Sequence, residues 1–495
     1  MHSLKPILFF CLFIALFLQH HAQANENDRL IILADMGNEP DEEQQMIHML
    51  VCSNEFDLEG LIAVTGKWLR NDPRDDLFFK LIDGYEKVYS NLLLHSDDYP
   101  EPDYLRKITV AGQSSYGMED VGKDKSSEGS ELILNALTSD DPRPVWIVVN
   151  AGSNTLAQAL FDYRRNHSSF EVAQLIEKIR VFENGSQDNA GAWICSEFPN
   201  IHWIRSNYQT YSYGGPGSST SNRKKSFGPN RWQPYANNPE GQHEWLKENV
   251  MENHGPLGNL YPIRIIRSSV FYMEGGGTIP WLGLVNKGLF DINHPSWGGW
   301  GGRFTGKKVA DFWSRHDDIR KDEKEVAPFY TYREVSDTWE NPKTGEILHN
   351  EFVPVWRWRE AFYNNFKCRM DWCVKDYENA NHHPVAAISG NQKNTILKMN
   401  ALAGETLEFD ASMSYDPDGD ELEYNWWIYQ EAGTYPGTIP VRNHTKAKSS
   451  IEVPSGAGGK QIHLILEVKD NNPIASLYDY RRIVINVNEQ IKYFD

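Results

Sequence analysis

The residues with the clearest chemical potential lie in one acidic segment, ADMGNEPDEEQ, near the start of the chain. Asp35 follows a short apolar run, and Asp41 and Glu42 open the amphipathic segment after it. Carboxylates that converge at the end of a strand repel one another unless a cation or a proton intervenes. Calcium suits such a group because it takes about six to eight hard oxygen ligands. The alternative is a helix start with acidic caps, which the helix dipole favours, and this segment alone does not decide between the two.

The surrounding sequence predicts how this segment is positioned. Apolar runs that read as strands alternate with stretches of helical spacing such as EEQQMIHMLVCS, and this order predicts βαβ units in an α/β domain with a mainly parallel sheet flanked by helices. The predicted strands are RLIILA (29–34), GLIAVTG (60–66), RKITVAG (106–112), PVWIVVNAG (144–152), KIRVFEN (178–184) and NIHWIRS (200–206). Ligands bind beyond the carboxyl ends of the strands in such sheets, so the loops after each strand hold the candidate residues.

A second segment with chemical potential is SQDNAGAW (186–193), which follows the apolar run RVF. Its Gln187, Asp188 and Asn189 can hydrogen-bond sugar hydroxyls, and the Trp193 indole can stack on a sugar face. The alternative is a plain turn. A third segment, WGGWGGRF (297–304), either lines the cleft with Trp297, Trp300 and Arg303 or is a close-packed loop, because glycine lets backbones approach each other.

The C-terminal part of the chain has a different character. From about residue 385, segments such as ETLEFDAS and QIHLILEVKD alternate polar and apolar residues, which predicts an all-β sandwich domain of about 100 residues. Its DPDGD turn is similar to that of PKD-like domains and offers Asp416, Asp418 and Asp420, either for a structural calcium or as an ordinary Asx-rich turn. We predict three segments: 1–24 a signal peptide, 25–384 the α/β domain and 385–495 the sandwich.

The N-terminal sequence and the overall composition indicate the cellular compartment and the kind of partner. Lys5, the apolar run 7–18 and the small residues at 22–24 predict a secretory signal cut after Ala24, and hence a secreted or periplasmic protein. No other run is long and apolar enough for a membrane span. A net charge of -19 argues against nucleic acid, while 16 Trp and 23 Tyr suit a carbohydrate partner as well as core packing. The sequence leaves a homo-oligomer open, and Cys368 and Cys373 could form a small disulfide in an oxidising compartment.

Five segments in the same order resemble the calcium-dependent nucleoside hydrolases over roughly residues 29–300. The acidic loop, GLIAVTGK, YGMEDVG (116–122), VVNAGSNTLAQAL (148–160) and SEFPNIHWI (196–204) carry the resemblance, with Lys67 where the family has Asn and Tyr116 where it has His. The resemblance implies a calcium site and several sugar contacts. The implied calcium ligands are Asp35, Asp41, Glu42, a backbone carbonyl near Asn154, and Glu274; the implied substrate-binding residues include Asn38, Lys67, Tyr116 and Asn200, with a weaker indication for Glu197.

A closer resemblance covers nearly the whole chain after the signal peptide. NEPDE, SQDNAGAW and WGGWGGRF are similar to the recurring features of exported bacterial proteins that join such a domain to a C-terminal sandwich and are labelled cellulose-binding. The expected function is therefore that of an exported glycosidase-like hydrolase, in which Asp35 acts as general base on a calcium-activated water. Tyr116, Asp120 and Asp188 remain open as the leaving-group acid. The alternative is a non-catalytic carbohydrate-binding protein on the hydrolase scaffold.

Overall fold

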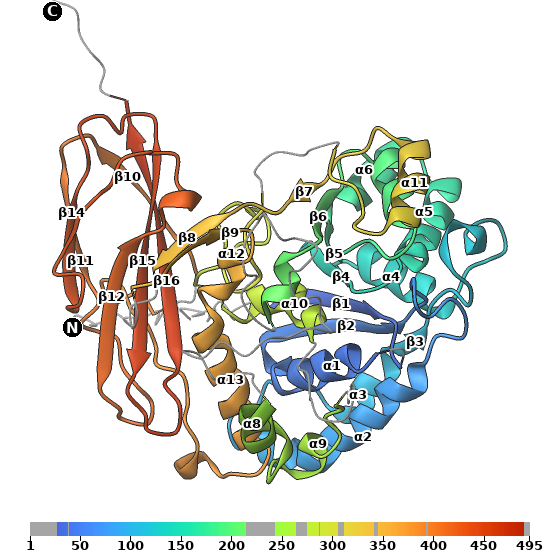
Figure 1. Ribbon diagram of the computed structural model, residues 1–495, viewed down its shortest axis with the longest axis horizontal. Helices are drawn as coiled ribbons and strands as arrows, with labels where there is room; N and C mark the ends of the chain where they lie inside the picture. Colours follow the sequence, from blue (N-terminus) through green and yellow to red (C-terminus); the bar gives the residue numbers. More distant parts are fainter. Residues whose placement is uncertain are drawn as a thin grey trace, which may run out of the picture.

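The computed structural model describes residues 27–37, 39–213, 243–263, 275–286, 288–304, 311–340, 345–392 and 395–489. These residues form an α/β domain and a β-sandwich that lies along one side of it (Figure 1). The predicted fold class is confirmed. The α/β domain is built on a seven-stranded sheet whose neighbouring strands are all parallel, in the order β3-β2-β1-β4-β5-β6-β7. Its strands are β1 (Asp28–Ala34), β2 (Phe56–Ala63), β3 (Thr109–Ala111), β4 (Val145–Val149), β5 (Ile179–Asn184), β6 (His202–Ser206) and β7 (Tyr332–Arg333).

Helices cover both faces of this sheet because side chains alternate along each strand. In β1, Leu30 and Ile32 point into one core cluster, and Ile31 and Leu33 point into the other. The first cluster gathers helices α1 (Asp41–Val51), α2 (Asp75–Leu92), α3 (Pro102–Lys107), α8 (His243–Leu246), α9 (Gly255–Gly258), α10 (Ile279–Leu282) and α13 (Arg359–Trp372), with α12 (Val353–Trp356) just before α13. The second gathers α4 (Glu128–Thr138), α5 (Asn154–Asn166), α6 (Ser169–Glu177) and α7 (Ala190–Glu197), with α11 (Asp317–Val326) packed against α7.

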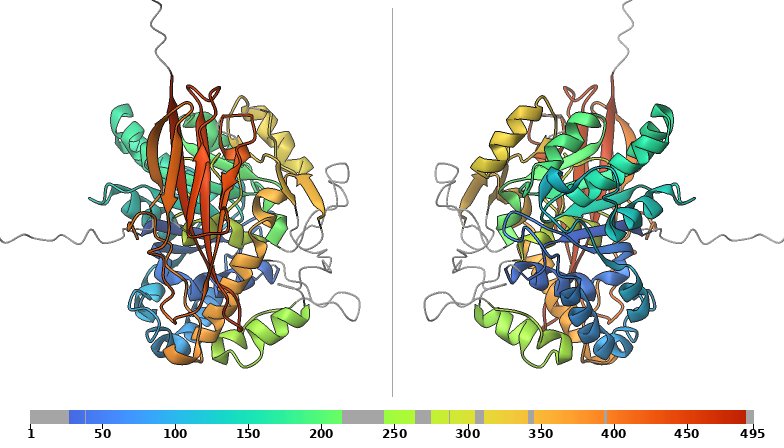
Figure 2. Two further views of the ribbon diagram at one scale, coloured as in Figure 1. Left: turned by 90° about the vertical axis from the view of Figure 1, so that its left-hand side faces the viewer. Right: turned by 90° about the vertical axis from the view of Figure 1, so that its right-hand side faces the viewer.

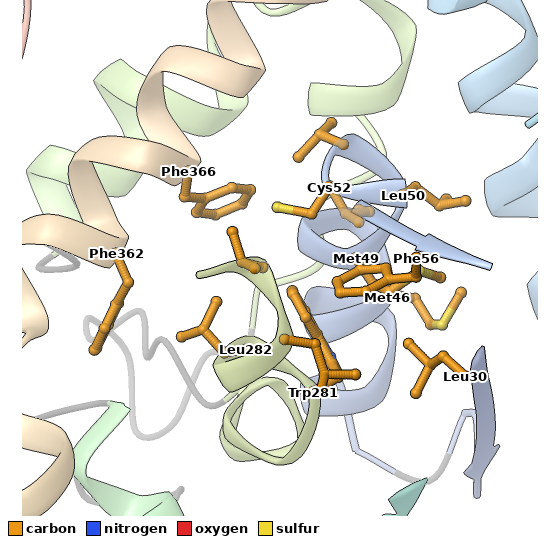
Figure 3. Packing of buried hydrophobic residues seen from close by; sticks show 14 of the residues in the cluster. Leu30, Met46, Met49, Leu50, Cys52, Phe56, Trp281, Leu282, Phe362 and Phe366 are labelled. Carbon is orange, nitrogen blue, oxygen red and sulfur yellow. The ribbon is translucent and has the colours of Figure 1, made fainter. Parts of the chain in front are cut away.

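Helix α1 is held firmly against the sheet, and this fixes the acidic segment at its start. Met46, Met49 and Leu50 of α1 are fully buried and pack with Trp281 of α10 and Phe366 of α13 (Figure 3). Burial of such side chains stabilises the fold by about 1.5–3 kcal/mol each. The acidic residues of the first turn are therefore carried on a rigid element.

The order of the strands creates a crevice at the carboxyl edge of the sheet. From β1 the chain proceeds outward to β2 and β3, then returns to the other side of β1 for β4, β5 and β6. The connections after β1 and β4 thus leave in opposite directions, which opens the crevice where ligands bind in open α/β sheets. Asp35 directly follows β1, and Asn150 directly follows β4.

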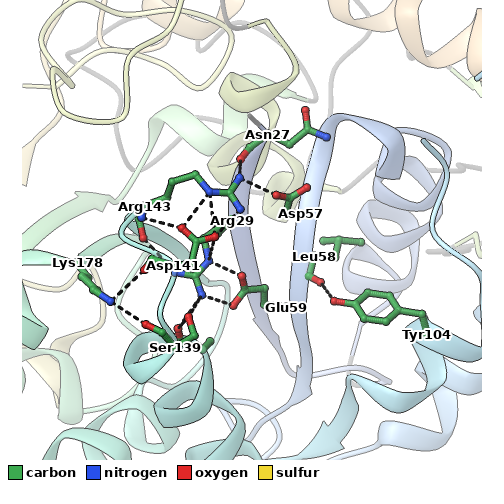
Figure 4. Close-up of polar contacts among 11 residues, drawn as sticks. Asn27, Arg29, Asp57, Leu58, Glu59, Tyr104, Ser139, Asp141, Arg143 and Lys178 are labelled. Carbon is green, nitrogen blue, oxygen red and sulfur yellow. Dashed lines mark hydrogen bonds and ion pairs between the residues drawn. The ribbon is translucent and has the colours of Figure 1, made fainter. Parts of the chain in front are cut away.

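The opposite, amino-terminal edge of the sheet is closed by paired charges (Figure 4). Arg29 binds Glu59 and donates to the Ala136 carbonyl at 2.7 Å, while Arg143 donates to Asp57 at 2.7 Å and to Asp141 at 2.6 Å. Each of these carboxylates thus faces a guanidinium. Charge at this edge serves the structure.

The β-sandwich consists of a four-stranded sheet, β10-β16-β15-β12, and a three-stranded sheet, β11-β14-β13. Their pairings are antiparallel apart from that of β10 with β16. The strands are β10 (Leu397–Leu402), β11 (Thr406–Asp410), β12 (Leu422–Ile428), β13 (Val441–Arg442), β14 (Lys448–Glu452), β15 (Gln461–Asp470) and β16 (Tyr478–Asn488). A separate hairpin, β8 (Asp337–Glu340) with β9 (Ile347–Asn350), lies between the sandwich and the α/β domain (Figure 1).

The WGGWGGRF segment forms the junction between the two domains. The backbone N–H of Arg482 in β16 donates to the Gly288 carbonyl at 2.8 Å, and its guanidinium donates to the Gly298 carbonyl at 3.0 Å. Arg303 bonds Asp337, which also accepts a 2.6 Å hydrogen bond from Tyr429. Trp297 and Trp300 are buried. The close-packed alternative therefore holds, and these residues do not line the cleft. In Figure 2 the sandwich lies in front of the α/β domain in the left view and behind it in the right view.

Two further predictions can be compared with the structure. Cys368 and Cys373 are buried free thiols, so the predicted disulfide is wrong. Both lie at α13 five positions apart, where Cα atoms on a helix are too distant for a disulfide. Among the described residues, no helix has both the length and the apolar character needed to cross a membrane. The predicted signal peptide lies outside the described residues.

Candidate active site

Asp35 lies in the crevice at the carboxyl end of β1 and is only 6% exposed. A Cβ added to Gly66, in the loop after β2, would lie 2.6 Å from Asp35 Oδ2 and 3.0 Å from Gln187 Oε1. The two oxygens therefore face the same stretch of backbone. Burial raises the pKa of Asp35 well above its usual value, and the negative charges of Asp41 and Glu39 raise it further. Three strand ends thus meet around this carboxylate.

Glu42 projects from the first turn of α1 into the same crevice and is 3% exposed. Its Oε2 accepts a 3.2 Å hydrogen bond from the Asn150 amide at the end of β4, and that amide also donates to the Gly277 carbonyl at 3.2 Å. Burial raises the pKa of Glu42, and Asp41 and Asp35 add to the rise. Glu42 and Asp35 therefore act electrostatically on each other.

The charges at this edge differ from those at the amino-terminal edge. Among the described residues, no lysine, arginine or histidine forms an ion pair with Asp35 or Glu42. Three nearby buried amide oxygens have no hydrogen-bond partner in the described part of the chain: those of Asn150, Asn154 and Gln187. Unpaired buried charges and acceptors are costly unless a cation or proton satisfies them. Carboxylate and amide oxygens are the types of ligand that calcium prefers.

The structure brings only part of the predicted calcium set together. The carboxylate oxygens of Asp35, Asp41 and Glu42 do not all lie within 4.8 Å of one another; the acidic triplet that does so among the described residues is Asp416, Asp418 and Asp420 in the sandwich. Asp41 is near enough to raise the pKa values of both Asp35 and Glu42. The predicted ligand Glu274 and the predicted substrate contact Asn38 lie outside the described residues.

Asn154 lies at the start of α5, at the same edge of the sheet. Its amide donates to the Ser115 carbonyl at 2.7 Å, and its backbone N–H donates to Asp188 at 3.1 Å. Asp188 also accepts hydrogen bonds from the Ser153 hydroxyl and from the backbone of Ala190, both at 3.0 Å. Asp188 is 1% exposed and joins the starts of α5 and α7. These contacts give Asp188 a structural role. Burial raises the pKa of Asp188 to about 6.

Asn189, Lys67 and Tyr116 lie in loops at the carboxyl edge. The Asn189 side-chain oxygen accepts from the Met118 N–H at 2.9 Å and thereby holds the loop that carries Tyr116. The Lys67 ammonium binds Asp318 at the start of α11. The Arg70 guanidinium lies 4.3 Å from the centre of the Tyr116 ring. The structure therefore brings Lys67 and Tyr116 to the rim of the crevice.

Neither Trp193 nor Asn200 is shown to face Asp35. Trp193 is half-buried on α7, where its ring packs against Phe198 and lies under the Arg164 guanidinium. Asn200 is exposed just before β6, at the amino-terminal edge, and Glu197 nearby pairs with Arg164. Since parallel strands place their starting and finishing ends at opposite edges, Asn200 cannot contact a ligand beside Asp35, and the contacts of the Trp193 ring with Phe198 and Arg164 occupy it elsewhere. We remove both from the candidate site.

Helix α11 is fixed in place by a buried ion-pair network. Arg205 of β6 binds Glu183 of β5 at 2.6 Å and Glu323 of α11 at 2.7 Å, and all three side chains are at most 1% exposed. Glu323 also accepts from Ser186 at 3.0 Å. Asp318, which pairs with Lys67, therefore lies on a helix that is held firmly in place.

Two residues of the site, Asn150 and Trp68, were not predicted from the sequence. Asn150 follows the apolar run VWIVV, where its position at a strand end could have revealed it. Gln187 of SQDNAGAW was predicted to bind sugar hydroxyls, but only the fold shows that its amide donates to the Asn150 carbonyl at 2.8 Å. Trp68 follows Lys67 and is 59% exposed.

Comparison with known proteins identifies related families for both domains. A family model described as the nucleoside hydrolase-like domain of cellulose-binding Sde182 matches residues 29–304. A second, described as the C-terminal domain of cellulose-binding protein Sde0182, matches residues 406–487. No curated protein matches the chain.

Solved structures give the same result. A nucleoside hydrolase-related hypothetical protein from Saccharophagus degradans, described as associated with carbohydrate metabolism, is 37% identical. The match covers 93% of this chain and 100% of that one, with a TM-score of 0.80. The PKD domain of human KIAA0319 is 10% identical over 20% of this chain and 80% of its own, with a TM-score of 0.15, which supports no argument.

Proposed function

The chain belongs to the family of cellulose-binding proteins with a nucleoside hydrolase-like domain, and from this premise we propose that it hydrolyses a glycosyl bond, N- or O-linked, in fragments of plant or microbial polysaccharide. The observation that carries the proposal is the pair of buried carboxylates, Asp35 and Glu42, at the strand-order crevice. Neither has an ion-pair partner among the described residues. Paired charges would suffice for stability, as at the amino-terminal edge, so unpaired ones at a ligand-binding edge favour a role in chemistry.

Asp35 is the proposed general base. Its carboxylate faces the backbone of Gly66, as does Gln187 Oε1. A water held there could give its proton to the Asp35 carboxylate and be oriented by the Gln187 side chain. Glu42 is fixed by the Asn150 amide and supplies negative charge next to the developing oxocarbenium ion. Direct attack by water predicts inversion at the anomeric carbon, which proton NMR of the first product measures.

Calcium is the proposed cofactor. Asp35 and Glu42 would hold it, together with Asp41, Glu274 and an oxygen near Asn154 as the family resemblance implies. When bound, calcium would bind vicinal sugar hydroxyls and lower the pKa of the attacking water. Export through the predicted signal peptide would bring the protein to polysaccharide and to a compartment in which calcium is available.

Tyr116 is the candidate for protonation of the leaving group that the geometry favours. It lies at the rim beside the Arg70 guanidinium, whereas Asp188 is buried and saturated with donors. Asp120, the third candidate, accepts from the backbone N–H of Ser115 at 2.9 Å and belongs to the same loop. Replacing Tyr116 with Phe should lower kcat for substrates with poor leaving groups and spare those with good ones.

A non-catalytic carbohydrate-binding protein is the second candidate, which the description of the family favours. The discriminating experiment measures two properties of one variant, Asp35→Asn. We expect it to lose sugar release from a broad glycan panel and to keep retention on insoluble polysaccharide. Asp57→Asn, a carboxylate at the opposite edge, is the matched control and should keep both. If the wild type with calcium releases nothing from the panel but is retained, the second candidate replaces the first.

A further inference from the structure

Trp68 is the one exposed tryptophan among the described residues, at 59%. A large apolar side chain left in water at the rim of a crevice is informative, because tryptophan is highly buried on average. No other exposed large hydrophobic residue of the described chain adjoins it in sequence. A small ligand with one apolar face fits a single exposed ring.

The chain places Trp68 close to Asp35. Gly66, where an added Cβ would lie 2.6 Å from Asp35 Oδ2, donates its N–H to the Leu69 carbonyl at 2.8 Å and so closes a tight turn. Lys67 and Trp68 are the two corner residues of that turn. Two residues span at most about 7 Å of chain, so the indole starts roughly one sugar unit away from the carboxylate.

The ring is held in place by its neighbours and stands open on the rest of its surface. The His316 ring meets it edge-on, at 85° and 6.2 Å between centroids, and the Lys67 ammonium lies 5.2 Å from its centre. Lys67 is in turn paired with Asp318. The surroundings of the indole are thus polar and contain a neutralised pair, which suits an uncharged ligand.

Tyr116, the other aromatic side chain of this rim, is not available in the same way. The Arg70 guanidinium covers its ring at 4.3 Å. The Lys67 ammonium also lies over the Trp68 ring, but it is farther from the ring centre, and Trp68 is exposed whereas Tyr116 is half-buried. Trp68 therefore provides the more accessible aromatic surface. An aromatic ring packs against the axial C–H bonds of a pyranose whose hydroxyls are equatorial, and such rings are the units of a β-linked glucan.

We propose that Trp68 is a sugar-stacking platform that holds one glucose unit of a β-linked glucan chain while the neighbouring unit occupies the crevice at Asp35. The proposal rests on the proposed function for the identity of the crevice and extends it by defining the substrate as a chain of at least two sugars. A nucleoside or a single sugar would leave the platform unused.

The test is calorimetric binding of cellotetraose and cellobiose to the full chain in calcium buffer. We expect Trp68→Ala to weaken binding of cellotetraose about tenfold and Trp68→Phe to stay within about threefold of the wild type. Phe170→Ala is the matched control: Phe170 is 70% exposed on α6, at the amino-terminal edge, and its loss should change nothing.

The outcomes separate this proposal from the proposed function. Wild-type binding that Trp68→Ala weakens, without sugar release by the wild type, supports the platform and contradicts the hydrolase. Sugar release with equal binding by wild type and Trp68→Ala overturns the platform and leaves the hydrolase. A wild type that does not bind cellotetraose also overturns the platform. Where hydrolysis occurs, Trp68→Ala should raise KM for the tetramer and leave kcat unchanged.

Discussion

Replacing Asp35 with Asn should make the calcium-free protein more stable while abolishing its response to calcium. Asp35 is 6% exposed and Glu42 is 3% exposed, and the negative charge of Asp35 raises the pKa of Glu42 while that of Asp41 raises the pKa of both. Asn is nearly the same size and uncharged, so the substitution removes the cost of one buried, unpaired carboxylate. We expect a gain of roughly 1–3 kcal/mol in the free energy of unfolding without calcium.

Calcium narrows or reverses this difference in stability. A ligand at about 100 times its dissociation constant stabilises the folded state by about 2.7 kcal/mol, and the wild type should show this increment while Asp35→Asn does not. Urea unfolding followed by tryptophan fluorescence, with calcium and with chelator, measures all four values. Asp57→Asn, which removes a partner of Arg143, is the control and should keep the calcium increment. The reasoning is refuted if Asp35→Asn is less stable than the wild type in chelator, or if calcium stabilises both equally.

Three further substitutions test the structure around the site. Asp188→Ala should lower the free energy of unfolding in urea by roughly 3–5 kcal/mol, because it leaves three backbone donors buried without an acceptor. A loss under about 1 kcal/mol would contradict the structural role of Asp188. Gly298→Ala should lower the free energy of unfolding by about 2–4 kcal/mol, since φ of Gly298 is 76° and the new Cβ would lie 2.7 Å from the Tyr429 hydroxyl oxygen. An unchanged thermal unfolding temperature would contradict the close packing at the domain junction. Burial and Arg482 lower the pKa of His463 to about 2, so the unfolded chain binds the extra proton and stability falls as pH drops below about 6.5. His463→Gln should reduce the slope of unfolding free energy between pH 6 and 4 by about 1.4 kcal/mol per pH unit, and equal slopes for both proteins would contradict the assignment.

The fold of the α/β domain could be predicted because each strand is a short apolar run bounded by polar turns. A strand buried on both faces needs such a run, and VWIVV and RLIILA are runs of this kind. The sandwich was predictable for the complementary reason, since its strands alternate polar and apolar residues. In both domains the pattern of apolar residues along each strand matches the faces of the strand that are buried.

The candidate site was predictable only where strand order matters little. Asp35 and Glu42 follow the first strand, so any parallel arrangement places them at the carboxyl edge. Asn150 and Gln187 join them because β4 and β5 lie on one side of β1 in sequence order. Strand order comes from long-range pairing, which the sequence pattern does not contain.

The misplaced residues show the same limit. Asn200 stands in a segment that resembles a sugar-binding one, yet it precedes β6 and so lies at the wrong edge. Trp297, Trp300 and Arg303 have the composition of a cleft and are buried at the domain junction. Composition identifies glycine and tryptophan as suited to close contact, but it does not say whether the contact is a ligand or another domain.

Sugar release from a broad glycan panel tests the central claim most directly, with wild type and Asp35→Asn each assayed with calcium and with chelator. The account predicts reducing sugar from the wild type with calcium alone, and none in the other three samples. Release that persists in chelator would contradict the proposed cofactor, and release that persists in Asp35→Asn would contradict the proposed base. No release from any glycan by the wild type with calcium would contradict the hydrolase itself.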